Sequence, residues 1–76
     1  MNNNRRARIQ ALIYKLNDIQ SDIEIIKDEE QEYYDNMPES IQAGERGDKA
    51  QEAIDNLEST LDYLNDVTGF LEEALA

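Results

Sequence analysis

The residues of this chain best suited to chemistry are carboxylates, which form a line along its second half. Asp48, Glu52, Asp55, Asp62 and Asp66 follow one another in helical steps, with Ser59 inside the longest step. Residues three and four apart are neighbours on a helix surface, about 5–6 Å apart at Cβ. That interval is comparable to the phosphate spacing of a nucleic-acid strand. The line is therefore either the solvated outer side of an amphipathic helix or an imitation of DNA before a basic groove.

Metal and catalytic chemistry need groups that this chain lacks. It has no histidine and no cysteine, which removes the commonest general base, the commonest metal ligand and the usual thiol nucleophile. The carboxylates do not follow the Asp-x-Asp-x-Asp-Gly spacing of a calcium loop. A rod of two helices is expected to offer no pocket for a catalytic tyrosine. We therefore expect no enzyme activity, no metal site and no cofactor.

Tyrosine is the other residue type with a predicted role in binding. Tyr33 falls in an apolar helical row and is expected in the core, whereas its neighbour Tyr34 is turned away from that row. Because exposed aromatic side chains often anchor protein–protein contacts, Tyr34 is predicted to contact a partner. The predicted partner-binding residues are thus Tyr34, Asp48, Glu52, Asp55, Asp62 and Asp66.

Two heptad rows predict the elements that carry these groups. The first is Ile9, Leu12, Leu16, Ile19, Ile23, Ile26, Glu30, Tyr33 and Met37, and the second is Ala50, Ile54, Leu57, Leu61, Leu64, Thr68, Leu71 and Leu75. Alternating steps of three and four place each row on one helix face. The predicted fold is all-α, a single domain over residues 1–76. It is a coiled-coil-like antiparallel two-helix hairpin with helices over 4–35 and 46–75 and a turn with a short helical segment over 36–44.

Capping residues predict how the two ends of the hairpin are closed. Asn36 and Glu39 resemble a capping box at the start of the short helical segment, and Gly44 would end that segment. Arginines at the start of the first helix are unfavourable for its dipole. The antiparallel pairing is expected to relieve this by placing Glu72 and Glu73 beside them.

Further apolar residues lie outside both rows. The second helix carries Tyr63, Val67, Phe70 and Ala74, and the first carries Ile13, Tyr14 and Ile25. One interpretation is that they widen the core or sit singly on the surface. The other is a helix-on-helix contact with another chain, because a domain of this size buries little of its surface alone. We expect Tyr63, Val67, Phe70 and Ala74 to form an oligomer interface, which would make a dimeric four-helix bundle.

The charge is strongly acidic and unevenly placed. The net charge is −11, with residues 1–34 summing to −2 and residues 35–76 to −9. Direct nucleic-acid binding and attraction to a membrane surface both need a basic face, so neither is expected. A basic protein surface is the natural partner. The missing cysteines fit a reducing compartment, and no apolar run approaches the about 20 residues of a membrane span. We expect a soluble, cytoplasmic protein.

One segment resembles a known group of proteins. It reads Glu29-Glu30-Gln31-Glu32-Tyr33-Tyr34-Asp35-Asn36-Met37-Pro38-Glu39-Ser40-Ile41-Gln42, followed by Glu45-Arg46-Gly47 and Ala53-Ile54-Asp55-Asn56-Leu57-Glu58. The pattern, above all its Asn-Met-Pro-Glu-Ser stretch, resembles short, largely uncharacterised acidic helical proteins of phages and prophages of low-GC Gram-positive bacteria. The resemblance implies no catalytic residues. It implies a context in which such proteins often bind and disable a host protein, as anti-CRISPR and other anti-defence factors do.

Three functional hypotheses follow from these observations. The first is a non-enzymatic binding protein that occludes a basic surface of a host protein, in one version as a DNA mimic. The second is a homo-oligomeric structural or assembly protein with no foreign target. The third is a sponge for a small molecule such as a signalling nucleotide, bound between protomers by Arg46, Lys49 or the N-terminal arginines.

Overall fold

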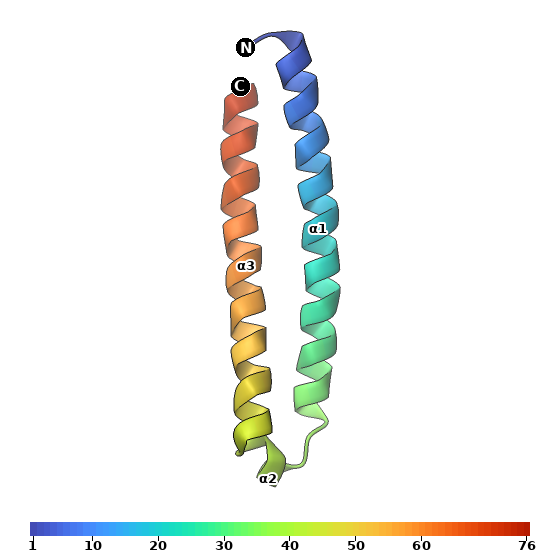
Figure 1. The fold of residues 1–76 in the computed structure, drawn as a ribbon, viewed down its shortest axis with the longest axis vertical. Helices are drawn as coiled ribbons and strands as arrows, with labels where there is room; N and C mark the ends of the chain where they lie inside the picture. Colours follow the sequence, from blue (N-terminus) through green and yellow to red (C-terminus); the bar gives the residue numbers. More distant parts are fainter.

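The computed structural model describes residues 1–76 as three helices, α1 (Asn3–Asp35), α2 (Glu39–Gln42) and α3 (Glu45–Leu75). α1 and α3 run antiparallel, the one-turn α2 lies in the connection, and the two chain ends lie together at the far end (Figure 1). The Cα atoms fill a rod of 58 × 15 × 13 Å. The structure thus shows the all-helical hairpin predicted from the sequence, and both long helices begin one residue earlier than predicted.

The connection between the long helices differs from the predicted capping box. The backbone N–H of Asn36 donates to the carbonyl of Glu32 at 3.0 Å, so Asn36 ends α1 and does not cap α2. Pro38 stands at the N-cap of α2, without a side-chain hydrogen bond. Ala43 is the C-cap of α2, and Gly44, which was predicted to end that segment, is the N-cap of α3. The prediction failed because Asn36 and Pro38 both suit a helix boundary. Asn36 is used to end α1, and Pro38 takes the N-cap position of α2.

A close approach at Gly47 fixes the angle between α2 and α3. Gly47 is buried within the first turns of α3. A Cβ atom on this residue would lie 1.9 Å from the carbonyl oxygen of Gln42. The side-chain amide of Gln42 in turn donates to the carbonyl of Tyr34 at 2.9 Å. Gly47 is therefore needed where α3 leaves the turn, a requirement that the sequence did not reveal.

At the open end of the rod, hydrogen bonds between side chains and backbone groups take the place of the predicted ion pairs. The guanidinium of Arg6 donates a hydrogen bond to the carbonyl of Leu75, which has no partner inside its own helix. Asn2 caps the start of α1 through its side chain. Glu72 and Glu73 form no ion pair. The positive charge of Arg6 is unfavourable at the start of α1, but here it lies at the C-terminus of α3, where the helix dipole favours a cation.

The row predicted for α3 is the one that faces α1. All eight of its members are buried or half-buried. Ala50, Ile54 and Leu61 form the buried part, and Ile54 is 2% exposed. The apolar rhythm of α3 therefore predicted its contact face correctly.

The row predicted for α1 is not its contact face. Apart from Gln10 and Gln31, which are half-buried at one margin of the contact, the buried or half-buried residues of α1 are Arg6, Ile9, Ile13, Leu16, Gln20, Ile23, Lys27, Glu30 and Tyr34. Ile13, predicted to lie outside the contact, is 4% exposed. Leu12, Ile19, Ile26 and Tyr33, predicted to lie inside it, are between 46% and 52% exposed. Relative to the prediction, α1 is turned about its axis, so that Gln20 and Lys27 occupy contact positions in place of Ile19 and Ile26.

None of the three helices contains a stretch that is both long enough and apolar enough to cross a bilayer.

Candidate interaction surfaces

The predicted acidic line is an exposed ridge of α3. Its five members, Asp48, Glu52, Asp55, Asp62 and Asp66, are all exposed, and they lie on the side of α3 opposite its contact with α1. From the first to the last residue the ridge is about 27 Å long at 1.5 Å per residue. The molecule has one ion pair, between Lys49 and Glu45 at 3.2 Å, so no member of the line is neutralised by a neighbour. The line is a row of negative charges without cationic partners, in which Asp55 accepts a hydrogen bond from the side-chain amide of Gln51 at 3.1 Å.

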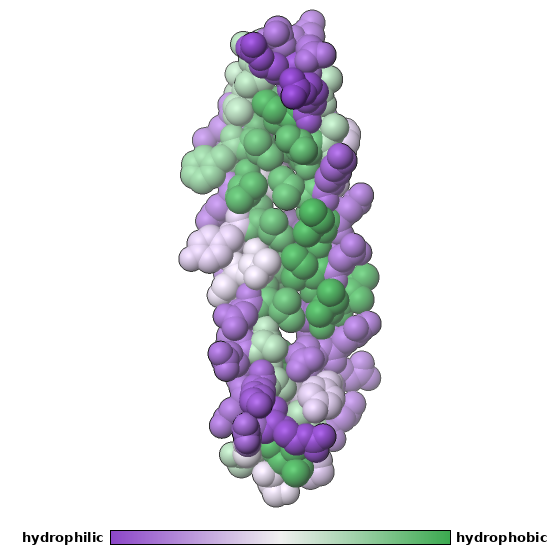
Figure 2. All heavy atoms as spheres, in the orientation of Figure 1, coloured by the Kyte–Doolittle hydropathy of each residue, from purple (hydrophilic) through white to green (hydrophobic).

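A second surface, the apolar face, combines residues of both long helices. Its members are Leu12, Ile19, Ile26 and Tyr33 of α1 and Tyr63, Val67, Phe70 and Ala74 of α3, all exposed. Each of them directly precedes a residue of its helix's contact row. Because α1 and α3 run antiparallel, the residues that directly precede contact positions project from the same side of the hairpin on both helices. Figure 2 shows this side, where apolar side chains of both helices gather into one broad patch.

The opposite side of the hairpin is polar. Of the residues that directly follow contact positions, Gln10, Asn17, Glu24 and Gln31 on α1 and Gln51, Glu58, Asn65 and Glu72 on α3 flank the contact, and Tyr14 is the one large apolar residue among the others. None of the eight flanking residues is apolar. The two sides of the hairpin that flank the contact between α1 and α3 therefore differ: one is apolar and the other is polar. The predicted oligomer interface, Tyr63, Val67, Phe70 and Ala74, is half of a larger surface whose α1 half had been assigned to the core.

The two adjacent tyrosines exchange their predicted places. Tyr34 is half-buried against α3, whereas Tyr33 is exposed on the apolar face. Tyr34 is thus less exposed than predicted, and Tyr33 is more exposed. The exchange follows from the turn of α1, because two consecutive helix residues point about 100° apart.

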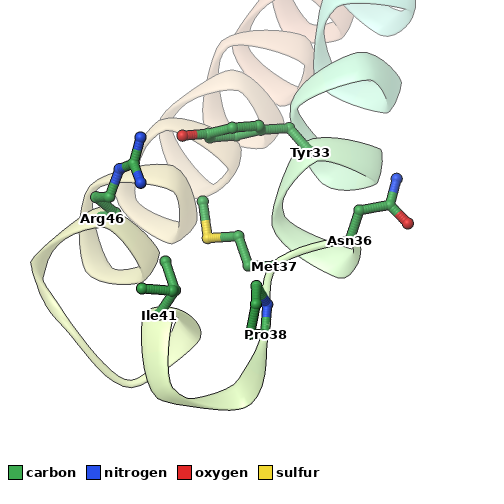
Figure 3. A pocket seen from close by; sticks show the side chains of 6 residues that line it. All are labelled: Tyr33, Asn36, Met37, Pro38, Ile41 and Arg46. Atoms are coloured by element: carbon green, nitrogen blue, oxygen red, sulfur yellow. The ribbon is translucent and has the colours of Figure 1, made fainter.

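Two hollows mark the ends of the apolar face, although no pocket was expected in a two-helix rod. The hollow of about 320 Å³ at the turn is lined by Tyr33, Asn36, Met37, Pro38, Ile41 and Arg46. Figure 3 shows the Tyr33 hydroxyl directed toward Arg46, with Met37 and Ile41 below the ring and Asn36 pointing away. The hollow of about 270 Å³ at the open end is lined by Met1, Arg5, Arg8, Ile9 and Leu12.

These hollows bear on the small-molecule hypothesis and on catalysis. Each contains arginine side chains beside apolar ones, whereas Lys49 is occupied by Glu45 and lines neither hollow. Both are open, and no cluster of carboxylates arranged to hold a metal ion is present. The structure thus offers extended surfaces for recognition, with two arginine-containing hollows at the ends of one of them.

The chain matches no protein-family model, and no curated protein or solved structure is significantly similar to it.

Proposed function

We propose that this chain is a non-enzymatic binding protein that occludes a basic surface on another protein. The observation that carries the proposal is the unpaired acidic line of α3. Five carboxylates stand free on the outer side of one straight helix, and the whole chain carries −11. Such a ridge attracts a basic groove over a distance and resists pairing with other acidic surfaces.

The mechanism is occlusion. Carboxylates at intervals of three and four residues present charge along about 27 Å of helix, which is long enough to cover a groove that would otherwise hold a nucleic-acid strand. In this DNA-mimic version, the helix competes with the phosphate backbone for the same lysines and arginines. Aromatic residues beside the ridge, Tyr63 and Phe70, are exposed and would slow dissociation of the complex.

The resemblance to small phage and prophage proteins supplies the context of the proposal. On that resemblance, the target is a host protein with a nucleic-acid-binding surface, and the biological role is anti-defence. The binding would take place in the cytoplasm of the host cell.

The test is a pull-down from a lysate of a low-GC Gram-positive host at low and high salt, with the retained proteins identified by mass spectrometry. One variant neutralises the acidic line with Asp48→Asn, Glu52→Gln, Asp55→Asn, Asp62→Asn and Asp66→Asn. A matched control removes five exposed charges elsewhere, with Asp18→Asn, Glu24→Gln, Asp28→Asn, Glu32→Gln and Glu58→Gln. The proposal expects a basic partner that is released by high salt, lost with the first variant and kept with the control. The occlusion proposal is contradicted if partner binding is the same at low and high salt, or if both variants weaken binding equally.

A second candidate function, self-assembly, is favoured by the apolar face. Seven large apolar side chains on one side of a 76-residue rod are exposed, and patches of this extent on soluble proteins mark interaction sites. A dimeric four-helix bundle would cover them. Self-assembly and occlusion are compatible, because the acidic line lies on the outer edge of α3 and not on the apolar face.

A further inference from the structure

We infer that a second copy of this chain covers the apolar face, with α1 of one copy running antiparallel to α1 of the other. The inference rests on the self-assembly function proposed above and deepens it by naming the face and the register. It differs from the interface expected from the sequence, which used α3 alone. Three observations carry it: the exposed area, the charges beside the apolar residues of α1, and the positions of the two hollows.

The solvent-exposed area of the single chain is larger than expected for its mass, and a second copy would account for the difference. The chain exposes 5647 Å², whereas a compact monomer of 8.8 kDa exposes roughly 4,800 Å². The excess of roughly 850 Å² is close to the about 800 Å² that each partner buries in a standard protein–protein interface. One further contact on one side of the rod would therefore bring this molecule to the exposure expected for its mass.

The charges beside the apolar residues of α1 are complementary to their own two-fold image. Arg8, Lys15, Asp22 and Glu29 form a row spaced by seven, one row outside Leu12, Ile19, Ile26 and Tyr33. All four are exposed, and none belongs to an ion pair. The row is basic in its first half and acidic in its second. An antiparallel copy therefore sets each basic half against an acidic half.

The register of this pairing follows from the same row. A two-fold axis midway between Asp18 and Ile19 places Arg8 beside Glu29 of the second copy and Lys15 beside Asp22 of the second copy. To within one residue, the same axis places Leu12 against Ile26 of the second copy. Ile19 then lies against its own counterpart. Charged and apolar residues thus select one register independently, as flanking charges do in coiled coils.

A parallel arrangement, with α1 lying over α3 of the second copy, is less complementary. It sets Glu29 near Lys49, which already bonds Glu45. It sets Arg8 and Lys15 beside Phe70 and Tyr63, where each can make a cation–π contact but has no carboxylate partner. The antiparallel pairing gives four ion pairs per dimer where the parallel one gives two.

The hollows at the two ends of the apolar face also meet in the antiparallel pairing. The open-end hollow contains Arg5 and the turn-end hollow contains Tyr33. The same two-fold axis sets Arg5 of one copy against Tyr33 of the other, where the guanidinium can lie over the ring. Both acidic lines then lie along one edge of the dimer, which doubles the negative surface available to a basic partner.

Disulfide trapping tests the register directly, because the chain contains no cysteine. We expect Ile19→Cys to form a disulfide-linked dimer under oxidation with copper phenanthroline. Asn17→Cys, an exposed residue of the polar face, is the matched control and should stay monomeric on a non-reducing gel. A mixture of Leu12→Cys and Ile26→Cys chains should form the mixed dimer in preference to either homodimer.

Charge exchange tests the same register without oxidation. Lys15→Glu should weaken dimerisation about tenfold in sedimentation experiments, since it replaces two attractive contacts per dimer with two repulsive ones. Adding Asp22→Lys to the same chain should restore the dimer, because the complementary pattern returns with its sign reversed. Failure of the double variant to recover would overturn the register.

The remaining outcomes separate this inference from the function on which it rests. If Leu12→Cys cross-links to Val67→Cys and Ile19→Cys does not cross-link to itself, the chain self-assembles in the parallel arrangement and the inference is wrong. If the protein is monomeric at every concentration, self-assembly itself is wrong and the apolar face belongs to a foreign partner. The occlusion proposal is untouched in either case, because its test uses the acidic line.

Discussion

α1 and α3 have nearly the same length and lie along each other, yet they use their apolar residues differently. α3 turns its heptad row onto α1 and keeps that row covered, with Ile54 only 2% exposed. α1 leaves half of its row uncovered and places Gln20 and Lys27 in the contact. Both helices carry apolar residues outside the contact. Those of α1 belong to the heptad row predicted as its contact face, whereas those of α3 lie beside its row.

A two-helix hairpin covers only one face of each helix, however wide the apolar side of that helix is. An arc that includes both Ile13 and Ile26 of α1 cannot lie against a single neighbour. The hairpin covers one margin of that arc and leaves the other margin on the apolar face. A third and fourth helix are the ordinary way to cover the remainder.

The strongest test of the turned α1 compares two consecutive residues that exchange roles. Ile13→Ala should lower the free energy of unfolding by about 2–4 kcal/mol, because its side chain is 4% exposed and truncation leaves a cavity. Leu12→Ala should cost less than about 1 kcal/mol in dilute monomer, since its side chain is already half exposed. Urea denaturation monitored by circular dichroism measures both. A larger loss for Leu12→Ala than for Ile13→Ala would restore the contact face predicted from the sequence.

Two glycines of α3 should respond in opposite directions to the same substitution. Gly47→Ala should destabilise the hairpin by about 1–3 kcal/mol, because the new Cβ would overlap the backbone of Gln42. Gly69→Ala should stabilise it by up to about 1 kcal/mol, since nothing lies within 4 Å of the added carbon and alanine is the better helix former. Thermal unfolding of the two variants checks the signs. Stabilisation by Gly47→Ala would mean that α2 does not lie where the structure places it.

The polar residues in the α1 contact offer a gain in stability that α3 does not. Gln20→Leu should raise the free energy of unfolding by about 1 kcal/mol, because a half-buried amide is replaced by an apolar side chain facing the α3 row. Asn17→Leu, on the polar face of the same helix, is the control and should change stability by less than about 0.5 kcal/mol. Equal effects of the two substitutions would show that Gln20 does not face α3.

The smallest expected effect concerns the arginines at the open end. Arg6→Ala should cost about 0.5 kcal/mol, since it removes the donor that satisfies the carbonyl of Leu75. It should also speed amide hydrogen exchange in the last turn of α3. Arg5→Ala, which removes an exposed guanidinium with no such bond, should leave that exchange unchanged. Identical exchange in the two variants would contradict the cap.

The sequence predicted the helices and the contact face of α3 because both depend on local periodicity and on one dominant row. It could not predict the turn of α1, because Ile9, Leu16 and Ile23 belong equally to the predicted row and to the observed one. The choice between Ile13 and Leu12 as their companion depends on how α1 meets α3. The close approach at Gly47 was hidden for the same reason, since it is a contact between α3 and α2.

The exposure of the five residues of the acidic line could be predicted from the sequence, whereas only the α3 half of the apolar face could be. Exposed charges follow from helix geometry alone, because they lie opposite whatever row is buried. The α1 half of the apolar face was missed because its residues have the composition and spacing of a core. Only the position of α3 shows that these α1 residues are uncovered. The same position explains why Tyr33 is exposed and Tyr34 is half-buried, the reverse of the prediction.

Sedimentation equilibrium of the unmodified protein tests the central claim most directly, namely that the hairpin leaves one apolar face for a second copy of itself. Over a concentration series up to about 100 µM, where a standard-sized interface is normally occupied, we expect the mass to rise to twice the 8.8 kDa of the single chain. A mass that stays at 8.8 kDa across the series would contradict the account.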